Sequence, residues 1–172
     1  MKAVLQRVAW AEVEVEGEII GRVERGLLVY VGVAAGDDEP AAVKLAEKVA
    51  LLRIFEDDGG KLNLSVNDVA GGVLAVPNFT LLADARRGRR PDFLSAARPE
   101  KAQPLYEAFL AALRHAGCTV ATGRFRAHMD IRSQADGPIN ILLEIPSREQ
   151  EQGEPRRPQS TRRNNRIPGR PS

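Results

Sequence analysis

The first 33 residues of the chain alternate apolar and polar side chains or carry short apolar runs, and both patterns are typical of β-strands. Residues 2–9 predict one strand, and residues 11–16 predict a second in which valine alternates with glutamate. Gly17 predicts a turn into a further strand at 19–23. The near-continuous apolar run at 27–33 indicates a central strand that is buried on both faces.

Two stretches in the middle of the chain repeat their apolar residues at helical spacing. Residues 39–53 do so after Asp38, which can cap a helix, and Pro40 is tolerated in the first turn. Residues 99–116 do so up to Gly117, a residue type that commonly ends helices. We therefore predict two amphipathic helices.

Further strands are predicted at 71–76, which stops at Pro77, and at 118–123, 125–133 and 139–145. Strands thus lie at both ends of the sequence, with the two helices between them. This order predicts a mixed α/β fold of three layers (β/β/α), in which two stacked sheets carry a helical layer on one face.

The length of 172 residues is enough for one domain with its own core, which we assign to residues 1–146. Residues 147–172 contain seven arginines, three glutamates and only Ile167 as a large apolar residue, so they predict a disordered basic tail. Its net charge is +4, against −2 for the rest of the chain. We favour a solubilising extension over the alternative, a non-specific contact to RNA phosphates.

Composition excludes several classes of function. No stretch approaches the roughly 20 apolar residues that span a bilayer, and the charged N-terminus does not look like a secretory signal, so a cytoplasmic location is expected. Cys118 is the only cysteine, and with His115 and His128 it makes no zinc set. The sequence lacks the phosphate-loop, dinucleotide, nucleophile-elbow and His-Glu-x-x-His motifs, so we expect no metal and no cofactor.

Residues that could carry chemistry singly have simpler interpretations. His115, near a helix end, and His128, in an apparent strand, are expected to be structural. Cys118 is expected to be a small buried apolar residue. The carboxylates Asp57 and Asp58 precede two glycines, which indicates a turn rather than a metal site.

Two segments remain unusual. The second buried strand runs into Pro77, Asn78, Phe79 and Thr80, where successive backbone N–H groups can point into a pocket and stabilise an oxyanion. Residues 136–138 (Asp-Gly-Pro) lie directly before the last strand. They form either an ordinary turn or a turn with a cis peptide that exposes two carbonyl groups.

These segments and further short matches resemble the D-aminoacyl-tRNA deacylase family over nearly all of residues 1–145. The matching stretches are 5–8, 15–18, 26–29, 32–33, 53–55, 61–64, 79–81, 88, 90–91, 93, 105–106, 123–125, 127–129 and 136–138. The resemblance implies a homodimeric hydrolase, without metal or other cofactor, that cleaves the ester bond at the aminoacyl-tRNA 3′ end. D-aminoacyl-tRNA and glycyl-tRNA are the implied substrates.

The resemblance also implies how handedness is read. The Gly137–Pro138 peptide is expected to be cis and to enter the pocket of the partner subunit, where both carbonyl oxygens receive the substrate α-amino group. An L side chain would then clash, whereas a D side chain points away. Arg7 is expected to fix this loop, and Met129 to lie beside the substrate.

Catalysis in the resembled family relies on main-chain groups. Backbone N–H groups of Phe79 and Thr80, with Asn78 and Pro77 beside them, would position the ester, while the terminal ribose 2′-OH helps to activate water. The family usually has Ser-Gln-Phe-Thr where this chain has Pro-Asn-Phe-Thr, and Gly-Pro-Val-Thr where it has Gly-Pro-Ile-Asn, ending at Asn140. A deacylase of relaxed chirality and a non-catalytic homologue that binds aminoacyl-tRNA are therefore kept as alternatives.

A basic loop follows the first of these motifs. Arg86, Arg87, Arg89 and Arg90 are candidates for contacts to tRNA phosphates, although a merely solvated loop has the same composition. A third alternative is a structural dimer that meets RNA only through the tail.

Overall fold

The computed structural model describes residues 1–86 and 88–146. The predicted tail at 147–172 and Arg87 of the basic loop lie outside the described residues.

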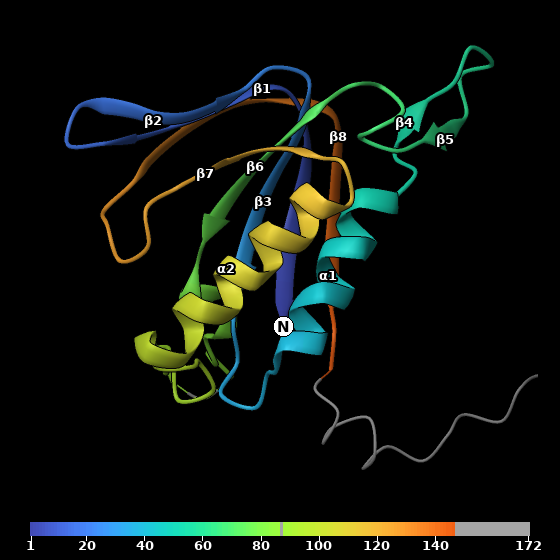
Figure 1. Ribbon diagram of the computed structural model, residues 1–172. Coiled ribbons are helices and arrows are strands. Elements are labelled where there is room, and N and C mark those ends of the chain that lie inside the picture. The colour runs from blue at the N-terminus through green and yellow to red at the C-terminus, as the bar shows by residue number, and fades with distance from the viewer. Residues whose placement is uncertain (87, 147–172) are drawn as a thin grey trace, which may run out of the picture.

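The two helices and most strands occur where the sequence predicts them, while β4, β5 and the 3₁₀ helix η1 were not predicted (Figure 1). The elements are β1 (Lys2–Val15), β2 (Glu18–Val23), β3 (Gly26–Gly32), α1 (Glu39–Leu51), β4 (Phe55–Glu56), β5 (Leu62–Leu64), β6 (Gly72–Pro77), the 3₁₀ helix η1 (Phe79–Leu82), α2 (Pro99–His115), β7 (Thr119–Thr122) and β8 (Asp130–Glu144). Asp38 caps α1 by accepting a hydrogen bond from the Ala41 N–H, as predicted. The predicted turn at 57–60 is confirmed, since Asp57 accepts hydrogen bonds from two backbone N–H groups of the β4–β5 connection.

Four strand predictions were wrong in their boundaries. The strands predicted at 2–9 and 11–16 are one strand, because β8 pairs along β1 from Lys2 to Glu14 and holds it extended. The strands predicted at 125–133 and 139–145 are also one strand, β8, because both parts pair with β1. It begins only at Asp130, because the turn at Arg124–Ala127, with Arg126 at a φ of +63°, interrupts the extended backbone. His128 therefore lies in a loop.

The main sheet has six strands in the order β2-β1-β3-β6-β7, with β8 paired to β1. β1 pairs antiparallel with β8 on one edge; on the other edge it pairs with β3 through its first half and with β2 through its second. β3, β6 and β7 run parallel. The mixed α/β class is confirmed.

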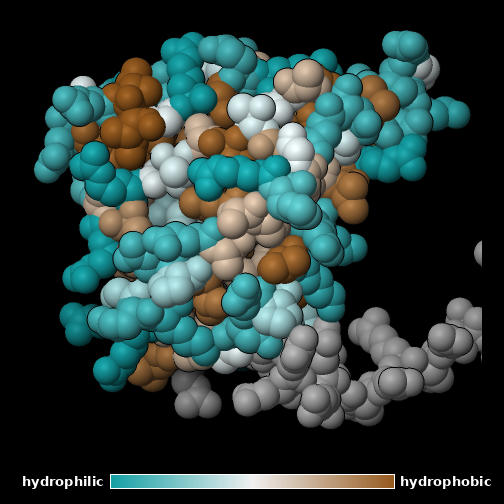
Figure 2. All heavy atoms as spheres, in the orientation of Figure 1, coloured by the Kyte–Doolittle hydropathy of each residue, from teal (hydrophilic) through white to brown (hydrophobic). Residues whose placement is uncertain are grey.

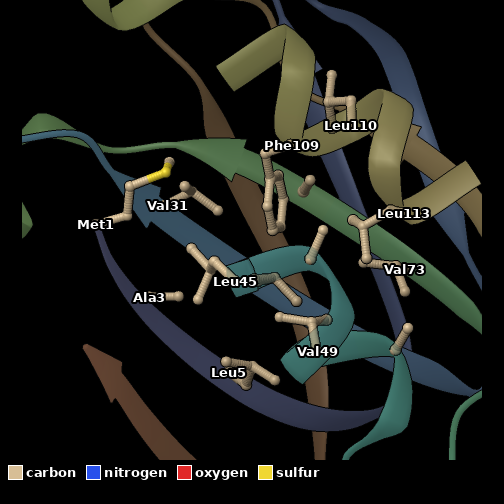
Figure 3. Packing of buried hydrophobic residues seen from close by; sticks show 14 of the residues in the cluster. Met1, Ala3, Leu5, Val31, Leu45, Val49, Val73, Phe109, Leu110 and Leu113 are labelled. Carbon is tan, nitrogen blue, oxygen red and sulfur yellow. The ribbon is translucent and has the colours of Figure 1, made fainter. Parts of the chain in front are cut away.

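The two faces of β3 and β6 carry different apolar clusters. Val31 and Val73 point to α1 and α2, where Leu45 and Phe109 complete the main core (Figure 3). Alternate residues such as Leu74 point the other way and meet the second half of β1 and β2. Both faces are thus covered, which explains the continuous apolar runs in these strands.

Figure 2 shows the surface of one face of the molecule. Hydrophilic side chains cover most of the face in Figure 2, and apolar ones gather over β2, where Ile19 is exposed. Among the described helices, none has the length and hydropathy to cross a membrane.

Candidate active site

A cavity of about 710 Å³ lies where β3 and β6 end. Its lining combines these strand ends, the start of η1, the N-terminal turns of α2 and the loop between β7 and β8. The lining includes Tyr30, Pro77, Asn78, Phe79, Thr80, Tyr106, Arg126, His128 and Met129. Most other lining residues are apolar, so the cavity suits a small organic group rather than a bare ion.

The segment from Pro77 to Leu82 is packed tightly against β3. The Asn78 N–H donates to the Val31 carbonyl at 2.8 Å, which extends the parallel pairing by one residue. Gly32 permits the approach, because a Cβ there would lie 2.4 Å from a Leu82 methyl and 3.0 Å from the Asn78 carbonyl oxygen. The position of this segment is therefore fixed by backbone contact.

Main-chain donors at this segment differ in availability. Asn78 Oδ1 accepts hydrogen bonds from the Thr80 N–H at 3.0 Å and from Thr80 Oγ1 at 2.5 Å. The Phe79 N–H has no hydrogen-bond acceptor within residues 1–86 and 88–146. Phe79 therefore offers the free donor, while the Thr80 N–H is already engaged by the asparagine.

Two phenols stand in the cavity wall. Tyr106 Oη donates to the Ala75 carbonyl at 2.9 Å and lies 2.7 Å from Thr122 Oγ1. Burial raises the pKa of Tyr106 far above its ordinary value, and burial also raises the pKa of Tyr30. Both phenols are neutral near pH 7 and serve as apolar walls with polar tips, not as bases.

The Gly137–Pro138 peptide is cis, as the family resemblance implied. It lies inside β8, not in a turn before the last strand, because the pairing with β1 jumps from Val8–Ala135 to Gln6–Asn140 and the residues between bulge out. Both residues are exposed. They do not line the cavity of their own chain.

Arg7 holds this bulge in place through contacts with Asp136. Its guanidinium Nε lies 3.0 Å from the Asp136 carboxylate and 3.3 Å from the Asp136 carbonyl oxygen. Nη1 donates to the Ile54 carbonyl at 2.8 Å, and the group lies over the Phe55 ring at 6.0 Å. Because the Arg7 side chain is only 7% exposed, its head cannot move away without leaving these acceptors unpaired.

Comparison with known proteins settles the family. The family model for D-Tyr-tRNA(Tyr) deacylase matches residues 4–144. The chain belongs to this family.

Similar proteins agree with that assignment. A protein of Halalkalibacterium halodurans named D-aminoacyl-tRNA deacylase is 52% identical over 144 residues, which is 84% of this chain and 99% of that one. A protein of Thermotoga petrophila with the same name is 54% identical, covering 84% and 97%. Among solved structures, the c-Myc DNA unwinding element binding protein superimposes with a TM-score of 0.80 at 38% identity, covering 86% and 100%.

The deacylase family sites predicted from sequence fall into two groups. Pro77, Asn78, Phe79, Thr80 and Met129 line one cavity. Arg7, Gly137 and Pro138 form a second site outside that cavity. Among the described residues, no hydrogen bond or ion pair joins the two groups.

Among the described arginines of the basic loop, Arg86 has a partner. Arg86 binds the Asp84 carboxylate and thereby lowers the pKa of that carboxyl to about 2. Arg89 and Arg90 are exposed.

Sequence reasoning missed several cavity residues. Tyr30 could have been found from strand alternation, since it shares a face with Leu28. Tyr106 belongs to a matched stretch but carried no assigned role. Arg126 gave no signal in the sequence.

The described residues contain no cluster of three or more His, Cys, Asp or Glu placed to bind an ion. Cys118 is buried, as predicted, and burial raises the pKa of its thiol. His128 is exposed, with Nε2 3.9 Å from the Asp130 carboxylate.

Proposed function

We propose that this chain hydrolyses the ester bond of D-aminoacyl-tRNA, releasing the free amino acid and tRNA. The observation that carries the proposal is a mostly apolar cavity with a free main-chain donor at Phe79, in a member of the D-Tyr-tRNA(Tyr) deacylase family. The names of the similar bacterial proteins support the same activity.

The reaction needs little from side chains. Water adds to the ester carbonyl carbon, the bond to the terminal ribose oxygen breaks, and that oxygen leaves with a proton. The Phe79 N–H would stabilise the oxyanion, and the ribose 2′-OH would help to orient and deprotonate the water. Thr80 Oγ1 is a poor nucleophile here, because its partner is an amide oxygen of Asn78 and not a base.

Selection against L-amino acids would come from a second subunit. The Gly137–Pro138 bulge is exposed, is held rigidly by Arg7, and lies outside the cavity of its own chain. Inserted into a partner's cavity, its carbonyl groups could bind the α-ammonium group and leave no room for an L side chain.

A homodimer would also cover an unpaired edge. β8 pairs only with β1 among the described strands, and Leu142 on it is 82% exposed. Long free edges with apolar residues favour association. The dimer and the three-layer arrangement of the family are both part of this proposal.

A deacylation assay tests the activity. Purified protein treated with EDTA is incubated with D-Tyr-tRNA, Gly-tRNA and L-Tyr-tRNA at equal concentration. We expect rapid release from the first two and at least about 100-fold slower release from the third. Equal release from D and L esters would instead assign a relaxed-chirality deacylase, and binding without turnover would assign a non-catalytic homologue.

The 2′-OH can be tested separately. D-Tyr-tRNA ending in 2′-deoxyadenosine should be hydrolysed about 100-fold more slowly than the ribose form if that hydroxyl helps to activate water. Equal rates would show that the ribose 2′-OH does not take part in the chemical step. Sedimentation equilibrium should give twice the chain mass, and a monomer with full selectivity would refute the cross-subunit loop.

A further inference from the structure

Arg126 stands between two neighbouring cavities. It lines the main cavity, and it also lines a second one of about 570 Å³ formed with the β1–β2 turn. The described residues that line the main cavity include two tyrosines, His128 and Arg126 as ionisable side chains. A mostly apolar pocket thus has a permanent cation at its junction with the next groove.

The neighbouring basic side chains lie near carboxylates, whereas Arg126 has no such partner among the described residues. Arg124 lies 3.8 Å from the Glu16 carboxylate, and His128 lies 3.9 Å from Asp130. For Arg126 the described part of the chain provides no ion pair or hydrogen-bond acceptor. The carboxylates of the second cavity are therefore engaged elsewhere, and the guanidinium is left available for an external anion.

The backbone at Arg126 is held in an unusual conformation. Its φ of +63° lies in the left-handed region that favours glycine and is sparsely used by residues with long side chains. Glu16 (φ 54°) and Ala70 (φ 50°) also lie in this region, each in a turn. Arg126 is likewise in a turn, which the Ala127 N–H closes on the Arg124 carbonyl oxygen at 3.3 Å, and this turn places the side chain at the junction of the two cavities.

The substrate class offers one matching anion. The aminoacyl-adenosine end of tRNA carries an ammonium group and no negative charge. The negative charge of the substrate nearest to the cavity is therefore the phosphate on the 5′ side of the terminal nucleoside. We propose that Arg126 binds this 5′-phosphate and thereby favours esters attached to a nucleotide chain. The proposal rests on the proposed deacylase function, which supplies the ligand.

Two small substrates isolate the contact. The D-tyrosyl ester of adenosine and the D-tyrosyl ester of adenosine 5′-monophosphate differ only in the phosphate group. We expect the wild-type protein to prefer the phosphorylated ester by about tenfold in kcat/KM, the usual scale for one charge-assisted contact at an accessible site. The preference should shrink as salt is raised, since the contact is exposed.

Variants assign the preference to this residue. Arg126→Gly, which removes the side chain and relieves the positive φ, should bring the ratio close to one while leaving the melting temperature equal or higher. Arg126→Lys should retain part of the ratio. Arg124→Ala is the matched control: Arg124 lies two residues away, lines only the second cavity and is paired, so the tenfold ratio should persist.

Failure of the two proposals can be told apart. A wild-type ratio near one, or a ratio that survives in Arg126→Gly, overturns the role of Arg126 even if both esters are hydrolysed. If neither ester nor charged tRNA is hydrolysed, the deacylase proposal fails. Calorimetric binding of adenosine 5′-monophosphate and adenosine then tests Arg126 directly, since only wild type should bind the phosphorylated form about tenfold more tightly.

Discussion

The two loops of the candidate site are held in place by different means. The segment from Asn78 to Leu82 is fixed by backbone contact with β3, at a glycine that leaves no room for a side chain. The bulge around Gly137 and Pro138 is fixed by one buried guanidinium that binds Asp136 and the Ile54 carbonyl. The first loop lines a cavity, and the second is exposed.

This difference indicates how each loop fails. A loop held by close backbone packing tolerates loss of side-chain atoms and is displaced when atoms are added. A loop held by a single charged side chain is released when that side chain is removed. Both loops would need sub-ångström placement for catalysis and for rejection of L-amino acids.

Arg7→Ala should have the largest effect on activity. Removing the guanidinium leaves the Ile54 carbonyl without its donor and frees the bulge, so we expect a loss of about 2 kcal/mol in the free energy of unfolding. The ion pair adds little to this figure because the Asp136 side chain is 42% exposed. Deacylation of D-Tyr-tRNA should fall about 100-fold. Urea denaturation and single-turnover kinetics measure the two effects.

Arg7→Lys separates charge from geometry at the same position. Lysine keeps the charge but cannot bind Asp136 and Ile54 with one planar group, so most of the activity loss should remain. Full activity in this variant would contradict the clamp.

Gly32→Ala should come second. Its Cβ would meet Leu82 and the Asn78 carbonyl, which must shift and carry η1 with them. We expect about 1–3 kcal/mol of destabilisation from overpacking and an activity loss of about tenfold. Gly59→Ala is the control, since a Cβ there would meet only Asp57 Oδ1 at 3.2 Å in an exposed turn. Unchanged activity in Gly32→Ala would contradict the inference that close backbone packing fixes the first loop.

Thr80→Val should have the smallest effect. It removes the hydroxyl that donates to Asn78 but keeps the shape and the backbone N–H. If the first loop acts only through its main chain, kcat/KM should stay within about threefold of wild type, as expected for a lost hydrogen bond of roughly 0.5 kcal/mol. A drop of more than about 100-fold would make the hydroxyl a catalytic group.

Much of the fold was predictable because its signals are local. The cap at Asp38, the helical spacing after it and the apolar run of β3 each act within a few residues. The wrong predictions lie where pairing with a distant strand decides the bounds of an element. β1 is one strand because β8 pairs along it, and residues 125–129 form a loop although their sequence is compatible with a strand.

The candidate site was predicted unevenly. The residues from Pro77 to Thr80 were found as an unusual strand end and as a family motif, and they line the cavity. The engagement of the Thr80 N–H by Asn78 was not foreseen, because it depends on a side-chain rotamer. Arg126 was missed because neither its exposure to two cavities nor its positive φ has a sequence signal.

The sequence by itself determined the order of most secondary-structure elements and the family motifs, since each depends on residue type and short spacing. Only the tertiary structure decided that β1 is shared between β3 and β2, that Arg7 reaches Asp136 across 129 positions of sequence, and that the bulge lies outside its own cavity. The reason is physical: contacts between distant residues are set by the packing of whole faces, which no local pattern encodes.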